Sequence, residues 1–303
     1  MDARITKQRL TNLLSYDWIK IIVAVVFAVL ALVAFFTTVK PRPGRFHTFT
    51  IYGYVGLHSG TAAMSMERDL LSEGVFSYDI LETDVEAFGE DEYSRMAFSA
   101  RRSSGAGNVM FTTTNLSPEG DESVLQSVAG GVMTEIALDL EVYLSDCEKY
   151  LIRFFGESWR EGALNQAEAE SCFLNRNSKD NRYRFSSAKR ELGIRDEYAR
   201  LEKLREDYIE VLGYFEDGTL GFATIKDENG TERKGAITLD KLSGLKRLFY
   251  YYSGEEKTAS SANMCMLIFR NDQDAGKPAS AVVNDLRYES ISFIRYLVGK
   301  FAV

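Results

Sequence analysis

The chain has 303 residues, of which 45% are hydrophobic and 26% are charged, and its formal net charge at pH 7 is −8. Five of its 36 basic and two of its 44 acidic side chains precede residue 41, so the remainder of the chain carries a net charge of about −11. A strongly acidic domain repels the phosphate backbone of nucleic acids and anionic lipid surfaces, which argues against a nucleic-acid partner.

Residues 21–39 contain no charged residue and no proline, and no other stretch of the chain is comparably apolar. Because a helix rises 1.5 Å per residue, about nineteen residues reach across the roughly 30 Å hydrocarbon layer of a bilayer. The sequence therefore predicts a membrane-spanning helix that contacts lipid. A cleaved signal peptide is one alternative, but its apolar region is shorter and ends at small residues, whereas Phe35 and Phe36 stand at that place. A buried core helix is the other alternative, and it usually has a polar stripe.

The lengths of the segments on either side of this helix indicate its orientation. A short N-terminal tail stays in the cytoplasm easily, while a long C-terminal part translocates as a domain largely regardless of its charge. We expect a single-pass protein of the cell membrane with a cytoplasmic tail (1–20), a transmembrane helix (21–39), a linker (40–45) and an extracellular domain (46–303).

The pattern beyond the linker predicts an α/β domain that begins with a parallel sheet. Strands are expected where aromatic and β-branched residues alternate, and helices where apolar residues recur at helical spacing. In chain order these are strand 46–55, helix 62–72, strand 78–85, helix 91–103 and strand 108–114. Strands that alternate with helices at such short spacing are joined by right-handed crossovers, which makes them parallel.

The second half of the domain is predicted to be mainly helical, with a hairpin and a short mixed end. The expected elements are helices within 122–155, a polar break at 175–181, a long charged helix at 187–215, a hairpin at 218–239, helix 239–252, strand 263–269 and helix 282–301. The hairpin turn is predicted at residues 227–230, because its Asn-Gly pair supplies left-handed turn residues.

Several segments, in this order, resemble the first lobe of the extracytoplasmic solute-binding proteins of carbohydrate-type ABC importers. These segments are FTIYGYV, YDILETDVEAF, MAFSARRSSGAGNVMFTT and IALDLEVYLSDCEKYL, the last of which contains a helix start of the form Asp-Leu-x-x-Tyr-Leu at residues 139–144. The likeness covers about a third of the chain. The N-terminal ITKQRLTNLLSYDWIKIIV is similar to the anchor of membrane-anchored relatives in Gram-positive bacteria.

The resemblance implies a periplasmic-binding-protein-like domain that captures a small carbohydrate beside the permease of an ABC transporter. Family members are longer and have two full lobes, so the second lobe is expected to be reduced here. Their clefts are rich in tryptophan for stacking on sugar rings, whereas Trp159 is the only tryptophan of this chain outside the anchor region. The alternative is therefore a ligand-free accessory or scaffold protein that binds a membrane partner.

Ligands of open α/β sheets bind beyond the carboxyl ends of the parallel strands. The polar and aromatic side chains that the sequence places there are the predicted ligand-binding residues: Tyr52, Tyr54, Glu86, Phe88, Thr113, Thr114 and Asn115. The aromatic run at 250–252 is predicted to lie on a helix, either facing this cleft or packing in the core or between lobes. A wet pocket at this edge would favour ligand capture, and a filled apolar one would favour a scaffold.

The sequence gives little support for an enzyme. The two histidines, His47 and His58, have no metal-binding spacing, and no motif holds a cofactor, so we expect no catalytic residue, metal or cofactor. A Ser-x-x-Lys motif at 186–189 matches that of penicillin-interacting enzymes, but the motifs that should accompany it occur in the wrong order. The cysteines are too few for a disulfide framework, and both one pair with a free thiol and three buried thiols remain open for Cys147, Cys172 and Cys265.

Overall fold

A computed structural model of the chain describes most of its residues. These are residues 18–39, 47–54, 56–89, 91–103, 107–116, 122–129, 137–177, 180–227, 229–254, 256–269 and 288–302. The predicted tail up to residue 17, the predicted linker and residues 282–287 of the last predicted helix lie outside them. The chain divides into two units, residues 1–43 and residues 44–303, and each is described by itself.

The first unit contains helix α2 (Trp18–Val39), which covers the predicted membrane segment. It has no glycine or proline, so nothing in its sequence interrupts the helix. The structure describes the side chains of Lys20 and residues 22–32 in this helix, and all of them are exposed. Among the described residues, no helix is both long enough and apolar enough to cross a membrane.

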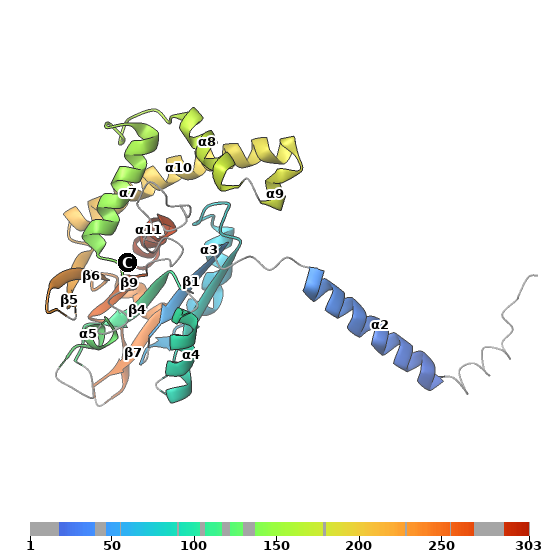
Figure 1. The fold of residues 1–303 in the computed structure, drawn as a ribbon. Coiled ribbons are helices and arrows are strands. Elements are labelled where there is room, and N and C mark those ends of the chain that lie inside the picture. Colours follow the sequence, from blue (N-terminus) through green and yellow to red (C-terminus); the bar gives the residue numbers. More distant parts are fainter. Residues whose placement is uncertain are drawn as a thin grey trace, which may run out of the picture. The chain divides into compact units, whose positions relative to one another are not determined.

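The second unit is built on a six-stranded sheet (Figure 1). In sheet order its strands are β3 (Glu82–Ala87), β1 (Thr48–Gly53), β4 (Val109–Thr113), β9 (Met264–Ile268), β6 (Glu232–Thr238) and β5 (Gly221–Lys226). β1 runs parallel to both β3 and β4, which confirms the parallel start predicted from the sequence. The other pairings in this sheet are antiparallel, so the domain has a mixed α/β fold.

Helices cover both faces of this sheet (Figure 1). Side chains of β1 alternate between the faces, so that Phe49 and Ile51 join a larger core cluster and Tyr52 joins a smaller one. The larger cluster includes residues of α3 (Ala63–Ser72), α7 (Leu140–Phe155), α10 (Ser187–Glu216) and α11 (Glu289–Phe301), and the smaller one residues of α4 (Glu92–Ser103) and α5 (Val124–Ala129). Every residue of β4 and β9 is buried, as expected for strands covered on both faces.

Three helices form what we call the helical arm: α8 (Gln166–Arg176), the short α9 (Asn181–Arg184) and the N-terminal half of α10. Each of them begins at a side chain that accepts a hydrogen bond from the first turn. The caps are Asn165, Asp180 and Ser186, which accept from backbone N–H groups at 3.2, 2.7 and 3.3 Å. The end of α8 and the start of α9 fall within the predicted polar break, and α10 matches the predicted long helix. These caps fix the changes of chain direction within the arm.

Two predicted elements differ from the structure. The strand predicted at 78–85 is displaced to β3, because Tyr78 and Asp79 bond to arginines of the helical arm instead of to a neighbouring strand. The helix predicted at 239–252 is wrong: a 3₁₀ helix, η2 (Ser243–Arg247), is followed there by strand β7 (Phe249–Ser253). β7 pairs antiparallel with β2 (His58–Ser59) and β8 (Thr258–Ser260) in a second, three-stranded sheet. The pairing of β7 with β2 and β8 decides the structure of this segment, although the leucines before β7 recur at helical spacing.

All three cysteines are free, so the structure has three thiols and no disulfide. Cys147 and Cys265 are buried and Cys172 is half-buried. Burial raises the pKa of the Cys265 thiol, and the charge of Asp240 adds to this effect. The Cys172 sulfur instead lies 2.8 Å from Nη2 of Arg153, at the surface between α7 and α8.

Candidate functional site

The aromatic residues of the predicted ligand site are packed against each other at the carboxyl edge of the parallel strands. Tyr52 is fully buried and meets the rings of Phe88 and Phe98 edge-on, with centroids 5.3 and 5.6 Å apart. Tyr54 is half-buried and also meets Phe98, at 5.5 Å. Phe98 comes from α4, so this helix fills the space that a solute would need next to Tyr52 and Phe88.

The polar residues of the predicted site bond to neighbouring parts of the domain. Glu86 on β3 lies 2.6 Å from Nη1 of Arg101 on α4, and burial raises the pKa of its carboxyl while Arg101 opposes that effect. Thr113 and Thr114 donate hydrogen bonds from their hydroxyls to the carbonyl of Asn263, at 3.1 and 3.3 Å.

A further hydrogen bond completes this contact between the end of β4 and the start of β9. Nδ2 of Asn263 donates to Oδ1 of Asn115 at 2.8 Å. The predicted residues thus lie at one edge of the sheet, but they fall into two groups: aromatic residues and Glu86 against α4, and the Thr113–Asn115 turn against Asn263. In both groups the side chains bond to or pack against the domain itself.

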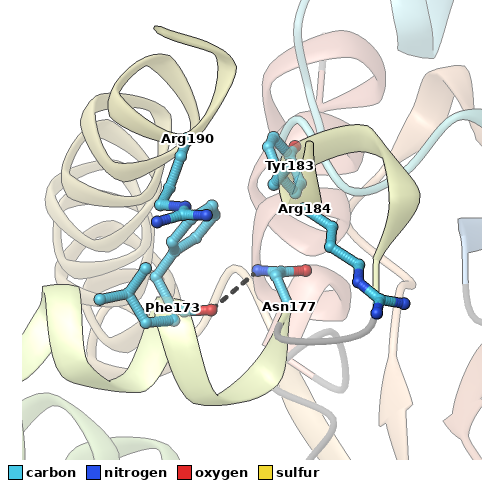
Figure 2. A pocket seen from close by; sticks show the side chains of 6 residues that line it. Phe173, Asn177, Tyr183, Arg184 and Arg190 are labelled. Atoms are coloured by element: carbon cyan, nitrogen blue, oxygen red, sulfur yellow. Dashed lines mark hydrogen bonds between the residues drawn. The ribbon is translucent and has the colours of Figure 1, made fainter. Parts of the chain in front are cut away.

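A cavity of about 220 Å³ lies in the helical arm, and we call it the arm cavity (Figure 2). Its lining comes from all three helices of the arm and from the ends that join them: Phe173, Leu174, Asn177, Tyr183, Arg184 and Arg190. Asn177 is 8% exposed and donates from Nδ2 to the carbonyl of Phe173 at 3.2 Å. Figure 2 shows the Asn177 oxygen on the side away from this bond. Burial raises the pKa of Tyr183 to about 12, although Arg182 opposes the shift, so its phenol is protonated near neutral pH and can donate.

A glycine on α10 allows the aromatic walls of this cavity to pack against the helix. Phe173 and Tyr183 meet edge-on, with ring centroids 5.1 Å apart. A Cβ atom at Gly193 would lie 2.5 Å from Cζ of Phe173 and 2.7 Å from Cε1 of Tyr183. Glycine inside a helix costs roughly 1 kcal/mol relative to alanine, and here it makes room for both rings.

The two arginines of the arm cavity differ from the arginines around them. Arg176, Arg182 and Arg200 each pair with a carboxylate, whereas no ion pair among the described residues includes Arg184 or Arg190. Arg184 lies over the ring of Phe185, 5.3 Å from its centroid. In Figure 2 the Arg190 side chain extends from α10 beside Phe173, and the Arg184 guanidinium lies on the far side of Asn177, directed away from Arg190. Two guanidinium groups without an ion-pair partner among the described residues therefore lie at this cavity.

A buried ion network joins the helical arm to the segment before β3. Arg176 lies 3.1 Å from Oδ2 of Asp79 and 2.7 Å from Oε2 of Glu197, and Arg182 lies 2.9 Å from Oδ1 of Asp79. Arg200 completes the network with a contact of 2.8 Å to Oε1 of Glu197. Burial would raise the pKa of Glu197, but Arg200 and Arg176 outweigh it and hold this pKa well below its usual range. Glu197 is thus ionised between its two arginines.

A second cavity, of about 360 Å³, lies between α10, α11 and the end of α3, and its charges are paired internally. Lys203 contacts Asp207 at 2.5 Å, and Lys300 contacts Glu73 at 2.9 Å. Arg295 donates to both oxygens of Glu210, at 2.6 and 2.9 Å. Because its cations already have partners, this cavity offers less free charge to a ligand than the arm cavity does.

The aromatic run at 250–252 lies on strand β7, not on a helix. Phe249 is buried beneath the strand, while Tyr250 and Tyr252 point to the other face and His58 of β2 lies opposite Tyr250. The ring centroids are 5.5 Å apart for His58 and Tyr250, 4.9 Å for His58 and Tyr252, and 5.4 Å for the two tyrosines. Tyr252 is 51% exposed, so this small aromatic cluster is accessible at the surface.

Comparison with known proteins gives no identity for the chain: no family model, no curated protein and no solved structure matches it. The assignment of a site therefore depends on the geometry described above. The arm cavity combines a built aromatic wall, a buried amide and two cations that have no carboxylate partner in the described parts of the chain, and it is the candidate functional site.

The sequence reading did not select the residues of the arm cavity. They lie at and beside the polar break, where no periodic pattern marks them. One signal was present, because Tyr183, Arg184 and Phe185 interleave aromatic and basic residues within a polar stretch. A second was Gly193 inside a long charged helix, where a glycine indicates close packing.

Proposed function

We propose that the chain is a membrane-anchored accessory protein whose extracellular domain binds a partner protein at the membrane. The anchoring is supported by the sequence alone: residues 21–39 contain no charged residue and no proline, and about nineteen apolar residues can reach across a bilayer. A binding role in place of solute capture is supported by the predicted ligand site, where Tyr52 and Phe88 are buried against Phe98.

The observation that carries this proposal is the surface around the arm cavity. Phe185 is 77% exposed, and the guanidinium of Arg184, which lines the cavity, lies over its ring. Aromatic residues and arginines are enriched in the interfaces between proteins. The domain as a whole is acidic, so a local pair of arginines that form no ion pair with any described residue favours a partner with acidic residues.

A second candidate is capture of a carbohydrate beside an ABC permease, and the aromatic cluster of His58, Tyr250 and Tyr252 favours it. Aromatic faces stack on the apolar faces of sugar rings, and phenol groups can bond to sugar hydroxyls. The phenol oxygens of Tyr250 and Tyr252 are 3.5 Å apart. This cluster is at the surface and outside the predicted ligand site, so it would hold a sugar without an enclosing cleft.

Photo-crosslinking in intact cells tests the first candidate. A crosslinking amino acid replaces Phe185, Tyr252 or Val142, the last of which is 57% exposed on α7 and serves as the control. We expect a protein adduct from position 185 and none from position 142. Absence of an adduct at 185, or equal adducts at all three positions, would contradict the proposal, and a glycan adduct at 252 would favour the second candidate.

Protease treatment of intact cells tests the anchoring independently. The domain beyond the linker should be digested and the N-terminal tail protected. A full-length chain that resists the protease would contradict the proposed orientation, and a mature chain that starts near the linker would show a cleaved signal peptide.

A further inference from the structure

We infer that the arm cavity takes the carboxylate side chain of an acidic residue in a partner peptide, next to an apolar residue that packs on the rim. This inference rests on the proposed function, because it names the chemistry of the partner at the same site. It is carried by three observations: the size of the cavity, its two arginines that pair with no carboxylate among the described residues, and its apolar walls.

The size of the arm cavity suits one side chain. Small-molecule sites usually measure about 300 to 1,000 Å³, and this cavity measures about 220 Å³. A free metabolite of ordinary size would therefore protrude, whereas the tip of a peptide side chain fits within it. The rest of the peptide would lie over the surface of α9 and the start of α10.

The charges of the arm cavity select a carboxylate. Arg184 and Arg190 line it from opposite sides of Asn177, and neither has a carboxylate partner among the described residues. A guanidinium binds a carboxylate through two parallel hydrogen bonds, and the bonds strengthen where water is excluded. The protonated phenol of Tyr183 and the amide of Asn177 are further polar groups beside such a carboxylate.

The walls and rim of the cavity favour a peptide in which an apolar residue stands next to the acidic one. Phe173 and Leu174 line it, and the exposed ring of Phe185 lies beside the guanidinium of Arg184. An aliphatic or aromatic residue next to the acidic one would cover these side chains and exclude water from the arginines. A segment such as Asp-Leu or Glu-Phe provides both features, while a free inorganic anion provides only the charge.

Binding of defined peptides to the full chain in detergent micelles tests this inference. The probes are capped tetrapeptides, Gly-Asp-Leu-Gly and Gly-Glu-Phe-Gly, with the matched amide peptides Gly-Asn-Leu-Gly and Gly-Gln-Phe-Gly, and sodium acetate as the free anion. Saturation-transfer NMR gives the dissociation constants. The variants are R184Q and R190Q, with R195Q as the matched control, because Arg195 is exposed on the same helix and does not line the cavity.

We expect the acidic peptides to bind at least tenfold more tightly than the amide peptides and acetate do. R184Q and R190Q should each weaken the binding of the acidic peptides about tenfold or more. R195Q should bind as the parent does, and added salt should weaken binding. Circular dichroism should show unchanged melting of all three variants, since these side chains are exposed and form no ion pair among the described residues.

Equal binding of acidic and amide peptides, no binding of any peptide, or an equal loss in R195Q would overturn the inference. Acetate binding as tight as that of the peptides would indicate a site for small anions instead of peptides, and would also overturn it. These failures are distinct from failure of the proposed function: a protein adduct from position 185 together with peptides that do not bind would leave partner binding intact and remove only the acidic chemistry.

Discussion

Replacing Glu197 by glutamine removes the carboxylate at the centre of the buried ion network and keeps the size of the side chain. Its oxygens accept hydrogen bonds from Nη2 of Arg200 and Nη2 of Arg176, at 2.8 and 2.7 Å, and from the hydroxyl of Tyr78 at 2.8 Å. The side chains of Arg200 and Arg176 are only 3% and 12% exposed. The substitution therefore leaves two buried guanidinium groups without this negative charge.

Loss of one partner from a buried ion pair costs about 3 to 5 kcal/mol, because the remaining charge is desolvated and uncompensated. Two features place Glu197→Gln at the lower end of this range. Arg176 keeps its contact with Asp79 at 3.1 Å, and the glutamine oxygen still accepts one hydrogen bond. We expect the free energy of unfolding to fall by about 3 kcal/mol.

Denaturant unfolding of the full chain in detergent micelles measures this loss, with the fluorescence of the buried Trp159 as the signal. Glu202→Gln is the matched control on the same helix, because Glu202 pairs with Arg205 but is 39% exposed, and such pairs contribute about 0 to 1 kcal/mol. Equal losses in the two variants would refute the reasoning.

The pH dependence provides a second check on Glu197. Its pKa in the folded protein is lowered, so its stabilising contribution is fully present above the unfolded-state pKa of about 4.3 and is lost as the pH falls towards the folded-state pKa. The difference in stability between parent and Glu197→Gln should therefore shrink in acid. A difference that grows as the pH falls would contradict the ionised state assigned to this carboxyl.

Three further predictions follow from packing, titration and burial. Gly193→Ala should destabilise the domain by about 1 to 2 kcal/mol in denaturant unfolding, because the new Cβ meets Phe173. Gly213→Ala is the control on the same helix: its new Cβ has open space, so it should stabilise the domain by up to about 1 kcal/mol. Because the pKa of Tyr183 is raised to about 12, its contribution to stability is lost as the pH rises from about 10 to 12, and Tyr183→Phe should lessen this alkaline loss in melting curves. Cys172 should be the one cysteine that reacts with a thiol reagent in the native protein, and mass spectrometry should find the two buried cysteines labelled only after unfolding.

The sequence was a good guide where local pattern decides the structure. The alternation of strands and helices up to β4, the β5–β6 hairpin and the long helix α10 follow from periodicity and from turn or cap residues. It was a poor guide at 239–252, where buried Leu242, Leu245 and Leu248 recur every third residue. That spacing suits a 3₁₀ helix as well as an α-helix, and the pairing of Tyr250 with His58 on a distant strand is invisible to local pattern.

The candidate site was less accessible to sequence reasoning for the same physical reason. The predicted residues do lie at one edge of the sheet, but whether that edge is open depends on Phe98 of α4 and Asn263 before β9, which reach it only in the folded domain. The arm cavity arises where three short or irregular segments meet. Arg184 and Arg190 stand out only in the folded structure, which shows that the neighbouring arginines pair with carboxylates.

The buried ion network also determines how the domain responds to mechanical load. Asp79 precedes β3 in the sheet, while its partners Arg176 and Arg182 lie in the helical arm about a hundred residues later. Ser77, beside it, donates its backbone N–H to Glu289 of α11 at 2.9 Å, which ties the same segment to a third element. A hinge between arm and sheet would have to separate charges that are shielded from water, at a cost of several kcal/mol. A force that pulls the arm away from the sheet therefore has to break these buried ion pairs.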